Sequence, residues 1–273
     1  MSAQTYKDLC SLIHQHSRIH LPPSKHTLLS SRLGKRLREL RLNSWEDYLN
    51  CLHDRPDEEI ETLIDLVSTN HTHFFRENEH FDMVSTQLLN ELLLHSPTAR
   101  EKLHCWSAAS SSGEEAFTLA IVLSEYAAQK AGGLRWQIDG TDISSRAIHR
   151  ARQAVYPIHR LGLPQPSLLH KYFQKGSGPF EGYCQVKNEL RSKVHFHRMN
   201  LFDKVYRIPA VQHVIFCRNA LIYFDLASQA QLIERLHDVL EPGGYLIVGH
   251  SESLLRIQHP FKVLGNSIYQ RKK

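Results

Sequence analysis

The hydrophobic pattern of the chain changes near residue 100, and this change limits the folds open to it. Up to about Leu94 apolar residues recur at helical spacing, most clearly in the leucines of residues 28–40. After Arg100 short apolar runs alternate with helical stretches, which indicates a mostly parallel sheet with helices on both faces. The pattern therefore predicts a small all-helical domain followed by an α/β domain.

The predicted boundaries follow from this pattern. We place the helical domain at residues 1–78, a linker helix at 79–95 and the α/β domain at 96–273. A hairpin turned by Gly265-Asn266 should add an antiparallel edge to the sheet. Residues 172–193 are rich in glycine and charge and interrupt the strand-helix alternation, so we predict an inserted antiparallel β subdomain there.

Composition narrows the class of protein. The 273 residues are 41% hydrophobic and 22% charged, which is typical of a globular chain. We expect no secretory signal, since no basic stretch followed by an apolar run is visible, and no apolar run approaches the roughly 20 residues that span a bilayer. Five scattered cysteines without a C-x-x-C pair indicate free thiols in a reducing cytoplasm. Nineteen histidines show no metal-binding spacing, so we predict no metal site.

The first predicted strand of the α/β domain ends in the small-residue turn SAASSSG, and Glu114 and Glu115 follow. Small residues allow a ligand to approach the backbone closely. Two carboxylates at a helix start would repel a pyrophosphate and suit a cofactor that carries positive charge. The alternative is that both glutamates only complement the helix dipole.

The second predicted strand ends in Gly140-Thr141-Asp142. An acidic residue at this point binds ribose hydroxyls in Rossmann-like domains, but Asp142 or Ser144 could equally be the N-cap of the next helix. With the small-residue turn, this acid points to an adenosine-bearing cofactor. These features alone do not choose between a nicotinamide and S-adenosylmethionine.

Four segments resemble the CheR family of chemoreceptor protein-glutamate methyltransferases. They occur in the family's order and are NHTHFFRE at 70–77, WSAASSSGEE at 106–115, FCRNALIYF at 216–224 and EPGGYLIVGHSE at 241–252. The resemblance implies a Rossmann-like methyltransferase sheet with a helical N-terminal domain and an inserted β subdomain. It further implies methyl ester formation on receptor glutamates, with S-adenosylmethionine as cofactor and S-adenosylhomocysteine as product.

The resemblance also implies the site residues. Cofactor contacts carry over to Asn70, Thr72, Arg76, Glu115, Asp142, Asn200, Leu201, Arg218 and Asn219. Arg76 and Tyr223 would lie near the transferred methyl group and act in catalysis. The alternatives are an interdomain salt bridge for Arg76, a buried core aromatic for Tyr223, and helix-start roles for Arg218 and Asn219.

Two further features concern partners. A basic helix carries Arg32, Lys35, Arg36, Arg38 and Arg41, with Glu39 in opposition, and is either a solvated face or a docking face for acidic receptor helices. The loop with Gly176, Gly178 and Pro179 is similar to that of family members that bind a receptor C-terminal pentapeptide. We expect a cytoplasmic enzyme that is recruited to membrane or soluble receptor arrays, without inserting into the membrane.

The net charge of +5 also raises a nucleic-acid methyltransferase as an alternative. Amino-methylating enzymes of that class carry an (Asp/Asn)-Pro-Pro-aromatic motif after the fourth strand, and residues 217–220 read Cys-Arg-Asn-Ala instead. A cofactor-binding adaptor without catalysis is a second alternative. We therefore expect no binding to nucleic acid.

Overall fold

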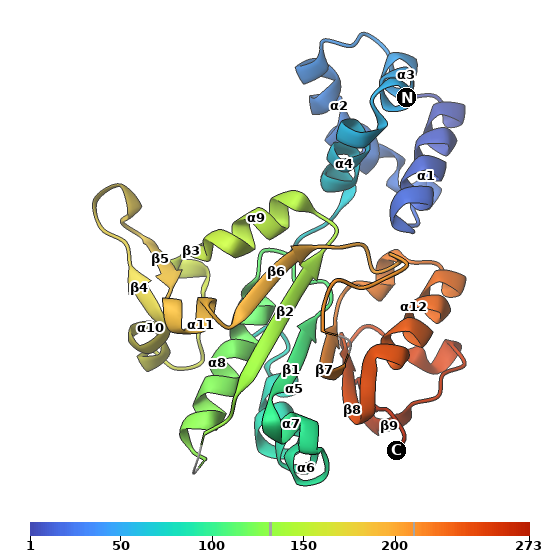
Figure 1. Ribbon diagram of the computed structural model, residues 1–273. Helices are drawn as coiled ribbons and strands as arrows, with labels where there is room; N and C mark the ends of the chain where they lie inside the picture. The colour runs from blue at the N-terminus through green and yellow to red at the C-terminus, as the bar shows by residue number, and fades with distance from the viewer. Residues whose placement is uncertain (131–132, 210) are drawn as a thin grey trace.

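The computed structural model describes residues 1–130, 133–209 and 211–273 (Figure 1). The N-terminal domain is all-helical, as predicted, and packs around a core of its own that includes Leu9, Ile13 and Tyr48. Its helices are α1 (Ala3–Ser17), α2 (His26–Leu40), α3 (Trp45–Asp54) and α4 (Pro56–Val67), with a 3-10 turn η1 (Pro23–Lys25). The Ser44 hydroxyl and the Asp47 carboxylate form a reciprocal capping box that starts α3.

The predicted linker helix belongs to the core of the sheet. It consists of α5 (Asn78–Met83), a π-helical turn η2 (Val84–Leu88) and α6 (Leu89–His95). Phe81 is buried in the same cluster as Phe117 and Phe216, and its ring stacks on that of Phe216 with centroids 5.2 Å apart. This segment is therefore a packed layer of the second domain.

A seven-stranded sheet of order β6-β2-β1-β7-β8-β10-β9 forms the second domain. The strands are β1 (Leu103–Ser107), β2 (Trp136–Asp142), β6 (Val194–Arg198), β7 (Gln212–Cys217), β8 (Leu240–Val248), β9 (Lys262–Gly265) and β10 (Ile268–Gln270). The first five strands in this order run parallel, and the last two pair antiparallel, as predicted. The hairpin turns at Asn266-Ser267, both at positive φ, one residue later than predicted.

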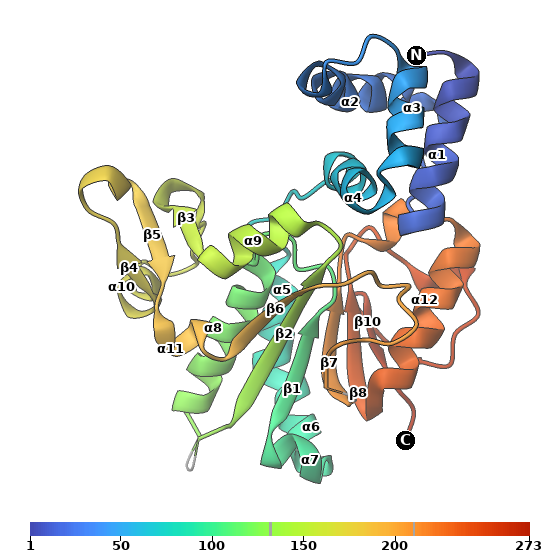
Figure 2. The same cartoon turned by 45° about the horizontal axis from the view of Figure 1, so that its top comes forward.

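Side chains on the sheet alternate between two cores, as expected for strands that are buried on both faces. In β7, Val214 and Phe216 join the core under α8 (Glu114–Ala128) and α9 (Ser145–Gln153), whereas Ile215 and Cys217 join the core under α12 (Leu226–Val239). A short helix α7 (Pro97–Glu101) precedes β1, and 3-10 turns η5 (Leu221–Tyr223) and η6 (Leu254–Arg256) follow β7 and β8. The helical domain lies beyond the carboxyl ends of the parallel strands (Figure 2).

The β subdomain is a separate three-stranded antiparallel sheet of order β3-β5-β4. It comprises β3 (Val155–Pro157), η3 (Ile158–Arg160), α10 (Ser167–Tyr172), β4 (Phe173–Lys175), η4 (Gly178–Phe180), β5 (Tyr183–Val186) and α11 (Asn188–Arg191). It therefore begins at Val155 and not near residue 172, because β3 is only three residues long and leaves no alternating pattern to detect. In the described parts of the chain, no helix is long and apolar enough to cross a bilayer.

Candidate active site

A pocket lies between the helical domain and the carboxyl ends of β1, β2 and β7. It encloses about 970 Å³ of empty space, part of it open to solvent. All nine residues predicted to contact the cofactor line it, and so does Tyr223. The helical domain contributes Ser17, Ile19 and residues 67–69, which sequence reasoning missed because no local signal marks them.

Asp142 ends β2 with a buried carboxylate. Its Oδ2 accepts a hydrogen bond from the Ser111 amide and its Oδ1 one from the Ser144 amide, each at 2.9 Å. The N-cap of α9 is Ser144, whose hydroxyl accepts from the Ala147 amide, so Asp142 is not the cap. Burial raises the pKa of Asp142 to about 6, against the lowering effect of the two amides.

The two glutamates after the first turn differ in their surroundings. Glu115 lines the pocket, accepts a hydrogen bond from the Ser107 hydroxyl at 2.7 Å and lies 3.6 Å from the Arg218 guanidinium. Glu114 instead accepts from the Ser112 hydroxyl. Burial raises the pKa of both carboxyls, and Arg218 partly offsets this for Glu115. A carboxylate turned into a pocket at a helix start can hold a positively charged group.

Arg218 is almost fully buried beneath the pocket. Its guanidinium packs over the rings of Phe81 and Phe216 at 5.3 and 5.8 Å and lies 3.3 Å from the Glu77 carboxylate. Its Nε lies 3.6 Å from the Glu115 carboxylate, and neither Nε nor Nη1 has a hydrogen-bond partner among the described residues. Because Arg218 lines the pocket, its guanidinium charge favours a ligand that carries carboxylate or hydroxyl oxygens.

The loop after β7 is held by Glu252, a residue that sequence reasoning missed although it lies in the last quoted motif. The buried Glu252 carboxylate accepts from the backbone amides of Asn219 at 2.6 Å, Gly249 at 2.8 Å and Ile222 at 3.3 Å. Asn219 adopts a left-handed φ of 56°, which asparagine tolerates better than most residues. Glu252 thus positions the loop that leads from Arg218 to Tyr223.

Arg76 lies in a strained segment, since its neighbours Phe75 and Glu77 have φ of 55° and 53°. The Arg76 guanidinium donates to the His71 carbonyl at 2.8 Å. Within the described residues no carboxylate forms a salt bridge with it, so the interdomain salt bridge is not found. Tyr223 is half-buried: it lines the pocket and also packs against the core of the helical domain, and its carbonyl accepts from the His20 amide at 2.8 Å.

The predicted basic face of α2 divides into two parts. Arg32 donates to the Val67 carbonyl at 2.6 Å, and Arg36 forms a 2.7 Å ion pair with the buried Glu59 of α4. These two side chains bind α2 to α4 and to the segment that follows it. The spacing of residues within one helix cannot predict such contacts with another helix. The remaining basic residues of the face, Lys35, Arg38 and Arg41, are exposed.

The loop with Gly176, Gly178 and Pro179 joins β4 to β5 at the tip of the β subdomain. A Cβ on Gly176 would lie 2.3 Å from the Phe180 carbonyl, so the loop closes only with glycine there. Phe180 and Tyr183 are 62% and 44% exposed at this tip, which leaves apolar surface available for contact.

This sheet order, its terminal antiparallel hairpin and a pocket with acids after β1 and β2 define a Rossmann-like methyltransferase. Two family models cover the chain: "CheR methyltransferase, all-alpha domain" matches residues 4–68, and "CheR methyltransferase, SAM binding domain" matches residues 70–270. The chain therefore belongs to the CheR methyltransferase family, and S-adenosylmethionine is its cofactor. The two models meet near residue 69, which agrees with the burial of Phe74 and Phe81 in the core of the sheet.

Curated relatives match over nearly the full chain. The chemotaxis protein methyltransferase of Salmonella typhimurium is 34% identical over 100% of this chain and 92% of its own length. The Escherichia coli protein of the same name is 33% identical with the same coverage. Chemotaxis protein methyltransferase 2 of Pseudomonas aeruginosa is 37% identical over 92% of this chain and 87% of its own length.

Proposed function

We propose that this protein methylates glutamate side chains of bacterial chemoreceptors to form methyl esters, and so adjusts receptor sensitivity in chemotaxis. It acts in the cytoplasm at receptor arrays. The observation that carries the proposal is the interdomain pocket at which Glu115, Asp142, Arg218, Arg76 and Tyr223 converge. The names of the relatives support chemotaxis as the pathway.

The pocket suits this chemistry because little acid-base work is needed. The bound cofactor supplies a methyl group on a positively charged sulfonium. A glutamate carboxylate, with an ordinary pKa near 4.3, is already ionised at neutral pH and needs no general base. Because charge is lost on the way to a neutral ester, a dry site favours the reaction.

The residues divide this work between binding and orientation. Asp142 accepts hydrogen bonds from ribose hydroxyls, and Glu115 faces the positive charge of the cofactor. Arg76 orients a carboxylate, either that of the substrate glutamate or that of the cofactor, and Tyr223 shapes the channel through which the methyl passes. Holding oxygen and methyl in line contributes several kcal/mol.

Transfer of radiolabelled methyl to receptor fragments tests the proposal. We expect base-labile label on the wild type, and about 100-fold lower turnover for Arg76→Ala and Tyr223→Phe at saturating cofactor. Arg100→Ala, on α7 at the opposite end of the sheet, should behave like the wild type. If no receptor fragment acquires base-labile label, the proposed function is wrong. Near-normal turnover of both variants would contradict the roles of Arg76 and Tyr223.

We also propose that the β subdomain binds the C-terminal pentapeptide of receptors. An extended peptide can add a strand to an open edge of a small sheet, and tethering would raise the local concentration of substrate. Calorimetry should detect binding of such pentapeptides to the wild type. Gly176→Ala should abolish it while leaving methylation of receptors that lack the pentapeptide unchanged. If no receptor pentapeptide releases or absorbs heat, the tethering role is wrong.

A further inference from the structure

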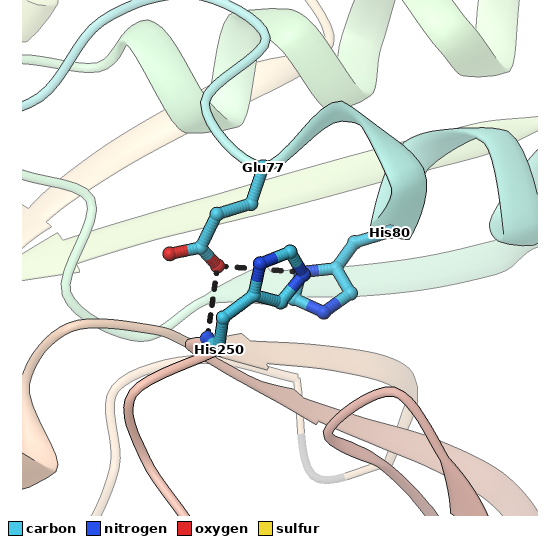
Figure 3. A group of neighbouring side chains, drawn as sticks. All are labelled: Glu77, His80 and His250. Carbon is cyan, nitrogen blue, oxygen red and sulfur yellow. Dashed lines mark hydrogen bonds and ion pairs between the residues drawn. The ribbon is translucent and has the colours of Figure 1, made fainter.

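Three potential metal ligands meet outside the cofactor pocket. Glu77 and His80 flank the start of α5, and His250 follows the end of β8 (Figure 3). One ligand atom from each residue lies within 4.8 Å of the other two. The sequence predicts no metal because His250 lies 170 positions after His80, and only the fold brings it to the other two residues.

His80 has a nitrogen that the rest of the fold leaves unpaired. Its ring is fully buried, and Nε2 lies 2.9 Å from the Asn266 carbonyl oxygen. Because a carbonyl oxygen can only accept, Nε2 must carry the ring proton. Nδ1 of the neutral ring then presents a lone pair, and in the parts of the chain that the structure describes it has no hydrogen-bond partner.

This lone pair faces a second acceptor. Nδ1 of His80 lies 3.5 Å from Oε2 of Glu77. A second ring proton would satisfy both groups, but it would place a charge on a fully buried ring close to Arg218, which pairs with the same carboxylate. A metal ion is another way to reconcile two facing acceptors, since it accepts a lone pair from each.

The geometry agrees with zinc coordination. Two ligands at about 2.0–2.2 Å from a tetrahedral zinc lie roughly 3.4 Å apart, which is close to the separation of Nδ1 and Oε2. Metal-bound histidine usually donates its other ring N–H to a carbonyl or carboxylate, as Nε2 of His80 does. We propose that Glu77, His80 and His250 form a binding site for one divalent zinc ion.

His250 gives the ion a route to the site. Its side chain is 43% exposed, and its ring meets that of His80 edge-on with centroids 4.5 Å apart. The Glu79 carboxylate lies 3.3 Å from Nε2 of His250, and either this carboxylate or a solvent water can supply the fourth ligand.

Competing interactions make this a moderate-affinity site. The Glu77 carboxylate already accepts from the Asn219 side chain and the His250 amide and lies 3.3 Å from Arg218. The guanidinium charge opposes a second cation nearby. The ligand set of imidazole and carboxylate favours zinc over magnesium or calcium, which prefer oxygen ligands.

Titration of the metal-free full-length protein with zinc chloride, against a chromophoric chelator, tests the site. The wild type should bind one zinc ion more tightly than any other. His250→Asn should lower the affinity for this zinc ion at least tenfold, and so should Glu77→Gln. His53→Asn, which removes an exposed imidazole from α3 in the other domain, should leave it unchanged.

We substitute the exposed His250 and not His80, because replacing the fully buried His80 ring could unfold the protein. Circular dichroism should show that His250→Asn and His53→Asn are both folded. Unaltered affinity and stoichiometry in His250→Asn would overturn the proposal, as would a wild type without a one-to-one zinc site.

Discussion

At the scale of single residues, burial of charged side chains at the pocket lowers the stability of the folded protein. Asp142 is the clearest case, because burial raises its pKa to about 6, whereas an unfolded chain would hold it near 3.8. The folded protein therefore retains an extra proton between about pH 4 and pH 6. The stability of the ligand-free protein falls as pH rises through this window.

Cofactor affinity should depend on the ionisation of Asp142, since the carboxylate accepts from ribose hydroxyls. We expect the dissociation constant for S-adenosylmethionine to rise about tenfold between pH 7 and pH 5, because protonation removes an acceptor. Calorimetry across this range measures the effect. Asp142→Asn should bind weakly with little pH dependence, and a wild-type pH profile in that variant would refute the assignment.

Glu252 acts on the site through backbone amides. Glu252→Gln replaces one acceptor oxygen by a donor that faces an amide, which should cost about 1–3 kcal/mol of stability. Because the loop from Arg218 to Tyr223 loosens, cofactor affinity should fall about tenfold. Glu241→Gln is a matched control: its carboxylate accepts from Ser96, at the other end of the sheet, so it should lower the melting temperature alone.

Equal loss of cofactor affinity in both glutamine variants would show that Glu252 contributes only to general stability.

Residues that act on a site through the backbone, as Glu252 does, are hard to find from sequence. Motifs identify side chains that meet a ligand, such as Arg218 and Asp142. The function of Glu252 depends instead on amides up to 33 residues away, and that of Ile19 depends on how two domains pack.

At the scale of elements, the basic residues of α2 fall into two groups: some are paired within the helical domain, and the others are exposed to solvent. Arg36 is committed to Glu59, and the Tyr48 hydroxyl also donates to that carboxylate. Only Lys35, Arg38 and Arg41 present charge outward, so electrostatic attraction to an acidic receptor helix rests on them.

Reversal of exposed charge on α2 should slow receptor capture. We expect Arg38→Glu with Arg41→Glu to raise the KM for receptor several-fold, mostly at low salt, without changing cofactor affinity. The control, Lys272→Glu with Lys273→Glu, makes the same charge change at the C-terminus, far from α2 (Figure 1). If both pairs raise KM alike, net charge and not α2 governs docking.

Most elements were predictable because each pattern is long enough to show its period. Strands β1 and β2 end at Ser107 and Asp142, where the small-residue turn and the Gly-Thr-Asp segment predict their ends. The short strand β3 was missed, since three residues cannot display alternation.

At the scale of the whole molecule, the two domains share the pocket and an apolar contact, in which Ile143, Tyr223 and Phe224 pack against the core of the helical domain. Polar contacts surround this apolar contact, such as Arg198 with Glu61 at 3.2 Å and His14 with Asp225 at 2.9 Å. A ligand that touches both domains should therefore stabilise their association. At 100 times its dissociation constant it adds about 2.7 kcal/mol.

Hydrogen exchange can measure this coupling. On binding S-adenosylhomocysteine, amides of residues 68–77, which connect the domains, should exchange more slowly, because opening the interface exposes this segment. Amides of β9 and β10 are the internal reference and should be unaffected. Unchanged exchange in 68–77 at saturating ligand would mean that the domains do not separate in solution.

The separate sheet of the β subdomain has a consequence for engineering and for evolution. The tip of its hairpin, Gly178–Phe180, contains no buried residue and does not line the pocket. Its sequence can therefore be exchanged without disturbing methyl transfer. A lineage, or a designer, could redirect the enzyme to new recipients by grafting other tips onto an unchanged catalytic body.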